Sequence, residues 1–148
     1  MMDRNSSGVP GQKRTRALFL CTNNSARSQM AEGFLVAYGQ ARFEVYSAGT
    51  VPTRVHPLAI KVMSEVGIDI SGQRSKSILD LEDIEFDVVV SVCDGAKGSC
   101  PVVHGKKVMH KAFPDPVTAD DGMTEELERF RAVRDMMKNW ILRTFVDK

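Results

Sequence analysis

Short apolar runs alternate with longer amphipathic segments along most of the chain. An apolar run over residues 17–21 is followed by a segment with helical spacing over about 25–38, and then by a second strand-like run over 43–47. Runs of strand length that alternate with helical segments indicate strand–helix–strand units built around a parallel sheet. The first third of the sequence therefore predicts two parallel strands joined by a helix.

The middle of the chain continues this alternation. A helix is predicted over 57–66, because Pro57 suits a first helical turn and Gly67 suits the position after a last one. Residues 87–92 form an apolar, mostly β-branched run. A run of this kind is typical of a central parallel strand that is covered on both faces.

Three further elements complete the pattern. A short helix over 76–80 and a fourth strand over 107–110 precede a long helix that begins near Thr124. The apolar positions of that helix recur every three or four residues and predict one buried stripe, formed by Leu127, Phe130, Val133, Met137, Ile141 and Phe145. The fold class is therefore α/β, with a single open parallel four-stranded sheet flanked by helices.

Composition sets the size and surroundings of this fold. The chain has 148 residues, 43% of them hydrophobic, which is enough for the core of one domain. We place that domain at 16–148 and interpret 1–15, rich in Ser, Gly, Lys and Arg, as a flexible tail. The net charge of +1 argues against a nucleic-acid or membrane partner. Since no apolar run approaches the roughly 18 residues of a membrane span and the opening residues lack a secretory signal, we expect a cytoplasmic protein.

Three cysteines, an odd number, speak against a static disulfide framework and for reactive thiols. Cys21 ends the first predicted strand, Cys93 follows the strand over 87–92, and Cys100 lies in the glycine-bearing segment beyond it. Asp115 comes just after the fourth strand. Because sites in open α/β sheets lie at the carboxyl ends of strands, these residues are candidates for one site.

The residues between the first strand and the first helix have the composition of an anion-binding loop. Backbone N–H groups over 23–28 can curl around one point, and the helix start adds its positive dipole end. Arg27 offers a planar guanidinium that suits bidentate contact with a tetrahedral oxyanion. These donors stabilise the thiolate of Cys21, which is the predicted nucleophile. We favour this interpretation over the alternative that Cys21 is only a buried residue and Arg27 a solvated one. The loop consists of Thr22, Asn23, Asn24, Ser25, Ala26, Arg27 and Ser28.

Three motifs together resemble a known family: CTNNSARSQMAEG over 21–33, YSAGT over 46–50 and Asp-Pro over 115–116. They are similar to the low-molecular-weight protein tyrosine phosphatase fold family. With the additional Cys93 and Cys100, the chain resembles the arsenate reductases of the thioredoxin-coupled type within that family. The similarity leaves out only the N-terminal tail.

The resemblance implies reduction of arsenate to arsenite and a role in arsenical resistance. Carried over to this chain, the Cys21 thiolate attacks arsenate held by Arg27, and Asp115 acts as the general acid. Cys93 then attacks Cys21, Cys100 attacks Cys93, and the final disulfide passes to thioredoxin or to a glutaredoxin system. Phosphate and sulfate are expected as arsenate analogues. No cofactor is implied, and we expect a monomer.

The loop departs from the family pattern at two positions. Asn23 stands where the family usually has glycine, and we expect Asn23 to adopt the left-handed backbone that asparagine tolerates. Ala26 stands where a second cysteine is common. That replacement removes a side disulfide without touching the three predicted relay cysteines.

A neighbouring ion site is also altered. Some relatives bind potassium through an Asn, a Glu, a Ser and an Asp, and this chain matches the first three with Asn24, Glu32 and Ser47. Lys76 takes the place of the aspartate. Our hypothesis is that the ammonium of Lys76 replaces the ion, so that the site is a vestige. The alternative is that Lys76 is a solvated residue.

Three other functions remain open. A tyrosine phosphatase would use the loop and Asp115 without the other cysteines, although the residues after Asp115 lack the tyrosines that such phosphatases often carry. A non-catalytic oxyanion-binding protein would leave two cysteines without a role. A zinc-binding or redox-sensing module is disfavoured, because its two cysteines lie further apart than the two to four residues usual in zinc sites. Its ligands would be Cys93, Cys100, His104 and His110.

Overall fold

The computed structural model describes residues 13–93, 103–117 and 122–147. The segments outside these ranges contain Cys100, Thr118 and residues 1–12 of the predicted tail, so the predictions made for them stay predictions. All other candidate residues lie within the described ranges.

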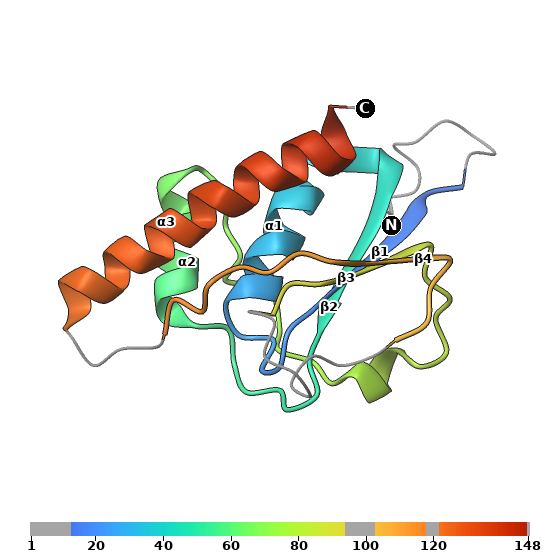
Figure 1. The fold of residues 1–148 in the computed structure, drawn as a ribbon, viewed down its shortest axis with the longest axis horizontal. Helices are drawn as coiled ribbons and strands as arrows, with labels where there is room; N and C mark the ends of the chain where they lie inside the picture. The colour runs from blue at the N-terminus through green and yellow to red at the C-terminus, as the bar shows by residue number, and fades with distance from the viewer. Residues whose placement is uncertain (1–12, 94–102, 118–121, 148) are drawn as a thin grey trace.

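Four parallel strands form one sheet in the order β2-β1-β3-β4 (Figure 1). Leu20, at the end of β1, is level with Ala48 on one side and Ser91 on the other. The predicted open parallel four-stranded sheet is therefore confirmed. The strands are β1 (Thr15–Leu20), β2 (Phe43–Ala48), β3 (Val88–Ser91) and β4 (Lys107–His110).

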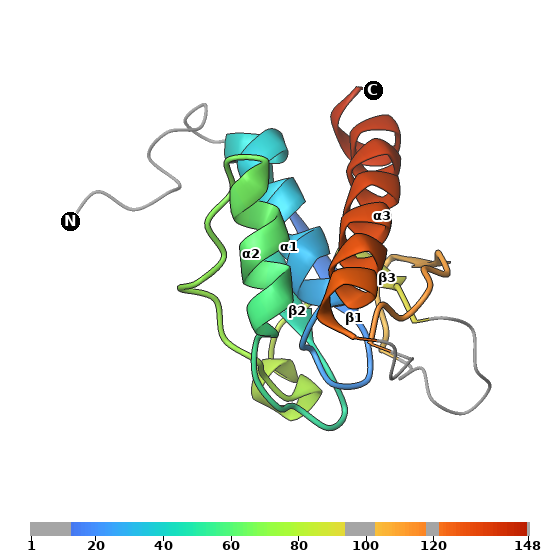
Figure 2. The ribbon, with the colours of Figure 1, turned by 90° about the vertical axis from the view of Figure 1, so that its left-hand side faces the viewer.

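Three α-helices lie together on one side of the sheet, as Figure 2 shows. They are α1 (Arg27–Gly39), α2 (Pro57–Glu65) and α3 (Met123–Ile141). Short helical turns complete the described elements: η2 (Gln40–Arg42), η3 (Ile78–Leu81) and η4 (Leu142–Val146). The helices predicted from the 3.6-residue period are thus present, each within a few residues of its expected start.

The two faces of β1 bury side chains against different partners. Ala17 and Phe19 point toward the helices and belong to the larger apolar cluster. Leu18 and Leu20 point the other way and pack with Leu81 and other apolar residues of the segment 78–86. This alternation is the two-residue period of a strand, and it leaves β1 covered on both sides.

The strand β3 is buried throughout, with Val90 fully inaccessible to solvent. Its position inside the sheet, between β1 and β4, explains why its sequence is apolar without alternation. The prediction of a central strand covered on both faces is confirmed.

Helix α3 covers the sheet with the predicted apolar stripe. Phe130 and Met137 are fully buried, whereas Leu127 and Phe145 at the two ends are partly buried and pack against the same cluster. Arg134 is also buried on this helix, which the apolar pattern did not predict. Its guanidinium donates to the Val62 carbonyl oxygen (3.0 Å) and to the Glu65 carboxylate (2.8 Å) of α2.

Candidate active site

The loop between β1 and α1 is held from outside by the segment that leads into α2. Three carbonyl oxygens of the loop accept backbone hydrogen bonds at 2.9, 3.3 and 2.9 Å. The pairs are Val51 N–H to Thr22, Thr53 N–H to Asn23 and His56 N–H to Ser25. In a trans peptide the carbonyl and the following N–H point in opposite directions. The outward Thr22 and Ser25 carbonyls therefore direct the N–H groups of the next residues to the inner side of the loop.

A small polar cavity of about 210 Å³ opens on that inner side. Its walls include Cys21, Ser25, Arg27, His56 and Asp115. The nucleophile, cation and carboxylate predicted from the sequence are therefore brought together around a single space. A space of this size suits a tetrahedral oxyanion, and the loop amides, Arg27 and the start of α1 supply the positive potential.

Arg27 is the first residue of α1 and reaches across the cavity to the segment after β4. Its guanidinium donates to the Phe113 carbonyl oxygen at 3.3 Å and lies 3.7 Å from an Asp115 carboxylate oxygen. These contacts orient the guanidinium toward the cavity. They also place Asp115 beside the position that a bound anion would take.

The thiol of Cys21 is almost inaccessible, with 3% of the residue exposed. Its sulfur lies 2.9 Å from the Ser28 hydroxyl oxygen. That oxygen also accepts a hydrogen bond from the Asn24 amide at 2.8 Å. When Cys21 is a thiolate its sulfur can only accept, so the Ser28 hydroxyl is then the donor. The contact therefore suits the thiolate form expected of the predicted nucleophile.

The left-handed residue of the loop is Asn24, with φ of 48°, so the prediction of this conformation at Asn23 was wrong. The physical reason lies in the Asn24 side chain, which is fully buried and hydrogen-bonded at both ends. Its amide nitrogen donates to Ser28 and Ser47, and its oxygen accepts from Gln29 and from the Lys76 backbone. These bonds hold the backbone in a conformation that asparagine tolerates.

The residues of the expected ion site lie side by side next to this amide. The Ser47 hydroxyl accepts from Asn24 at 3.0 Å and donates to the Glu32 carboxylate. The Lys76 ammonium lies 3.9 Å from the same carboxylate and donates to the Arg74 carbonyl oxygen at 2.7 Å. Burial lowers the pKa of Lys76, and the negative charge of Glu32 opposes that shift.

Cys93 lies just beyond β3, at the same edge of the sheet as Cys21. Its thiol is buried, with 1% of the residue exposed, and its sulfur is 3.9 Å from the Leu20 carbonyl oxygen. Cys100, the third predicted relay residue, lies outside the described residues. The structure therefore brings together four of the five predicted catalytic side chains at one end of the sheet.

The described residues do not support the alternative zinc site. His104 and His110 are both exposed, on a loop and at the end of β4. Within residues 13–93, 103–117 and 122–147, no group of three or more His, Cys, Asp or Glu side chains is arranged to hold a metal ion. No helix of the described residues is long and apolar enough to cross a membrane.

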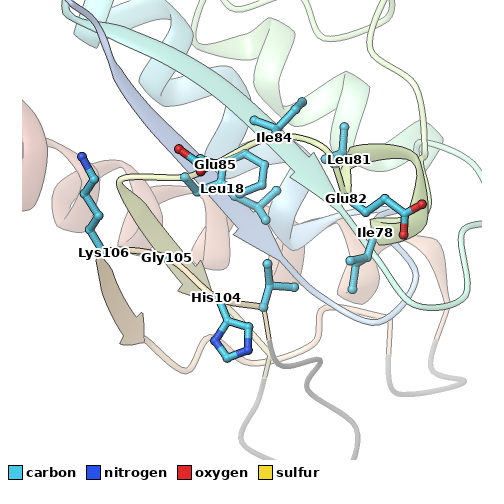
Figure 3. Close-up of a pocket in the computed structure, with 11 residues that line it drawn as sticks. Leu18, Ile78, Leu81, Glu82, Ile84, Glu85, His104, Gly105 and Lys106 are labelled. Atoms are coloured by element: carbon cyan, nitrogen blue, oxygen red, sulfur yellow. The ribbon is translucent and has the colours of Figure 1, made fainter.

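A larger cavity, of about 600 Å³, lies on the other face of the sheet (Figure 3). Leu18, Ile78 and Ile84 contribute to its apolar wall, and Glu82 and Lys106 lie at its charged margin. It contains none of the cysteines described above. We retain the smaller cavity as the candidate active site, because the predicted nucleophile Cys21 and the cation Arg27 line it.

Comparison with known proteins agrees with this geometry. Residues 16–145 match the family model described as low molecular weight phosphotyrosine protein phosphatase. An arsenate reductase of Halalkalibacterium halodurans is 45% identical over 119 residues, which cover 79% of this chain and 85% of that protein. The chain belongs to the arsenate reductases of this phosphatase family. A glutaredoxin arsenate reductase of Synechocystis is 43% identical and aligns over 83% of this chain and 90% of its own length.

Solved structures of arsenate reductases have the same fold. One, described as an arsenate reductase in the phosphate binding state, superimposes with a TM-score of 0.76 at 37% identity, covering 90% of this chain and 98% of its own. A thioredoxin-dependent arsenate reductase of Corynebacterium glutamicum gives a TM-score of 0.61 at 28% identity and covers 95% and 68%. The fold and family predicted from the sequence are confirmed.

Two features of the candidate site were not predicted from the sequence. His56 lines the cavity and ties its backbone to Ser25, and Ser28 was assigned to the loop without its contact to Cys21. His56 directly precedes Pro57, and a polar residue before a first-turn proline signals a helix N-cap. That signal locates the helix start, but only the fold brings the helix start to the loop.

Proposed function

We propose that this protein reduces arsenate to arsenite through a relay of Cys21, Cys93 and Cys100. The observation that supports this proposal best is the single cavity lined by Cys21, Arg27 and Asp115, with Cys93 at the adjacent strand end. The names of the relatives, including an arsenate reductase in a phosphate binding state, support an oxyanion as the ligand. Phosphate and sulfate are the analogues we expect to bind.

In the first step, arsenate occupies the loop with its oxygens on the backbone amides and on the Arg27 guanidinium. The Cys21 thiolate attacks arsenic and forms an S–As bond, while an arsenate oxygen leaves as water. Asp115 supplies the proton to the departing oxygen. The Ser28 hydroxyl, 2.9 Å from the Cys21 sulfur, stabilises the attacking thiolate.

In the second step, the Cys93 thiolate attacks the Cys21 sulfur, forming a disulfide as the S–As bond breaks. The bonding electron pair stays on arsenic, which is thereby reduced from arsenate to arsenite. Cys100 then attacks the Cys93 sulfur and frees the Cys21 thiolate. An external dithiol protein reduces the final disulfide; the names of relatives favour thioredoxin or a glutaredoxin.

The test is a single turnover with one equivalent of arsenate, followed by mass spectrometry of the intact and digested protein without reductant. Wild-type protein should yield arsenite and a Cys93–Cys100 disulfide, and the Cys100→Ser variant should stop at a Cys21–Cys93 disulfide. The Cys93→Ser variant should not release arsenite. Undiminished arsenite from Cys93→Ser would remove the relay and leave the phosphatase alternative.

Hydrolysis of a phosphate ester is a second candidate activity, because Cys21, Arg27 and Asp115 are the groups it needs and they line one cavity. Val117, exposed at the cavity margin, offers no aromatic wall for a tyrosyl ring. We therefore expect only weak turnover of p-nitrophenyl phosphate. If the Cys93→Ser variant retains this turnover, the phosphatase activity belongs to the loop and not to the relay.

We further propose that the Lys76 ammonium replaces a potassium ion beside the loop, supported by its 3.9 Å approach to the Glu32 carboxylate. Wild-type activity should then be equal in potassium and sodium chloride, and the Lys76→Asp variant should gain a specific stimulation by potassium. Specific potassium stimulation of the wild type would contradict this. The protein is also proposed to act as a cytoplasmic monomer, which size-exclusion chromatography with light scattering checks for the oligomeric state.

A further inference from the structure

His56 connects helix α2 to the wall of the active-site cavity. It is the N-cap residue of α2, and its imidazole Nδ1 accepts the Leu58 backbone N–H at 3.0 Å. Its own backbone N–H donates to the Ser25 carbonyl oxygen of the loop at 2.9 Å. One residue therefore caps the helix and fixes the loop at the same time.

The cap hydrogen bond determines where the imidazole carries its proton. Since Nδ1 accepts from Leu58, it holds a lone pair, and the neutral ring must carry its hydrogen on Nε2. The tautomer follows here from the hydrogen-bond network. His56 is therefore a hydrogen-bond donor at Nε2.

His56 both packs against α3 and lines the cavity. The His56 ring contacts Phe130 of α3, with ring centroids 4.8 Å apart. His56 also lines the cavity that Cys21 and Arg27 line. With Nδ1 directed at the helix backbone and one side of the ring on Phe130, Nε2 is the polar atom that remains for the cavity. Among the described residues, none forms a hydrogen bond with Nε2.

We propose that His56 is a substrate-contacting residue, whose Nε2–H donates to an oxygen of the oxyanion held by the loop and by Arg27. The proposal deepens the proposed function and rests on it for the identity of the oxyanion as arsenate. It adds a neutral ring donor to the cavity that the Arg27 cation also lines. A neutral donor contributes a directional bond without adding to the positive charge.

The charges around the ring are mixed. Burial lowers the pKa of His56, Arg54 also lowers it, and the carboxylates of Glu126 and Asp115 oppose the shift. The neutral form is thus the one present at neutral pH, and it is the form that caps α2. Protonation would place a second donor at Nδ1 against the Leu58 N–H and would break the cap.

Two substitutions separate the cap from the proposed contact. An asparagine carries an oxygen near the place of Nδ1 and is a good N-cap, but it has no group at the place of Nε2. A glutamine carries an amide near the place of Nε2 and is a poor cap. His56→Asn therefore keeps the helix start and removes the donor, whereas His56→Gln does the reverse.

The experiment measures binding of inorganic phosphate to the reduced full-length protein, by its protection of Cys21 from iodoacetamide, with thermal unfolding in parallel. Both variants lose the ring contact with Phe130 but only His56→Asn keeps the cap, so His56→Asn should melt above His56→Gln without phosphate. His56→Asn should bind phosphate roughly three- to tenfold more weakly than wild type, as expected for one lost hydrogen bond. His56→Gln should melt lower and bind phosphate within about twofold of wild type. The KM for arsenate should rise in His56→Asn with kcat largely kept.

Wild-type affinity for phosphate in His56→Asn would overturn the proposal, and so would an equal loss in both variants, since that would mean His56 only holds the loop. The readout does not involve electron transfer. A wild-type protein that binds phosphate but fails to reduce arsenate would refute the proposed function and leave the His56 contact standing.

Discussion

At the scale of residues, the hydrogen bonds behind Cys21 spread from the Asn24 amide in two directions. Glu32 accepts from Ser47, which accepts from the Asn24 amide. The same amide donates to Ser28, whose hydroxyl lies against the Cys21 sulfur and donates to it when Cys21 is a thiolate. Because a thiolate has no proton to give, the Ser28 hydroxyl is the side chain placed to donate to it before any substrate arrives.

Removal of the last hydroxyl tests this order. The Ser28→Ala variant should retain its fold and lose the hydrogen bond to the Cys21 sulfur, which is worth about 1.5 kcal/mol or more when the acceptor is charged. The pH profile of Cys21 alkylation by iodoacetamide should therefore move to higher pH by roughly one unit. Ser64→Ala, an exposed hydroxyl that donates within α2, is the matched control. Identical profiles for wild type and Ser28→Ala would refute the assigned direction.

The residues that could be predicted are those whose chemistry is local. Cys21 and Arg27 follow from a strand, a loop of small polar residues and a helix start, all within one segment. The left-handed residue was placed one position too early, at Asn23, because the bonds that hold Asn24 come from Ser47 and Lys76, far along the chain. The spacing of residues along the sequence does not indicate contacts of this kind.

At the scale of elements, the end of α2 shows how a single backbone conformation terminates a helix. Gly67 has φ of 83°. Its N–H donates to the Ser64 carbonyl oxygen, and the Ile68 N–H donates to that of Met63. This pair of bonds is the Schellman arrangement, which requires a left-handed residue just after the helix.

A pair of glycine substitutions tests that requirement. Gly67→Ala should destabilise the protein by about 1–2 kcal/mol, because only the positive φ opposes a Cβ there and no atom lies within 4 Å of it. Gly72→Ala also has open space around its Cβ but lacks the positive φ, so it should change stability little. Urea unfolding of both variants gives the comparison. Equal effects of the two substitutions would contradict the cap.

Ion pairs of Glu65 with Arg131 and Arg134 join α2 to α3 and give a second prediction. Hydrogen bonds from Arg131, which have the largest effect, and from Arg134 lower the pKa of Glu65 from 4.5 to about 2. A carboxyl whose pKa is lowered on folding stabilises the protein above its unfolded value, and this stabilisation is lost as the pH falls toward the folded value. Glu65→Gln should thus unfold more easily than wild type at pH 7.

The difference between wild type and Glu65→Gln should shrink between about pH 5 and pH 3, as measured by urea unfolding across that range. Glu82→Gln, which removes an exposed carboxylate of the segment after η3, is the control and should stay close to wild type at both ends. A difference that did not depend on pH would mean that Glu65 acts through packing alone.

Helices and strands could be predicted where a local sequence signal determines them. The strand β3 and the start of α2 fall where the sequence places them, because an apolar run and Pro57 are local signals. The burial of Arg134 within the α3 stripe was not predicted. Its position depends on Glu65, and only the packing of α2 against α3 brings that carboxylate to it.

At the scale of the whole molecule, the active site joins parts that are far apart in the sequence. The loop after β1 is bonded to the segment before α2 through Ser25 and His56. It is bonded through Asn24 to the segment before η3, and through Arg27 to the segment after β4. A ligand that engages the loop therefore engages most of the sheet's carboxyl edge, and its binding energy should appear as global stability.

Phosphate should accordingly raise the melting temperature of the protein in a concentration-dependent way. At a hundred times its dissociation constant the gain is about 2.7 kcal/mol, or roughly 5–10 °C for a domain of this size. Arg27→Lys keeps the charge but loses the planar fork, and should reduce the shift by more than half at the same phosphate concentration. Arg42→Lys, whose arginine is exposed and bonded to the Val146 carbonyl oxygen, should shift like wild type. An equal shift in both variants would mean that phosphate stabilises the fold by charge alone and that the guanidinium of Arg27 does not hold the anion.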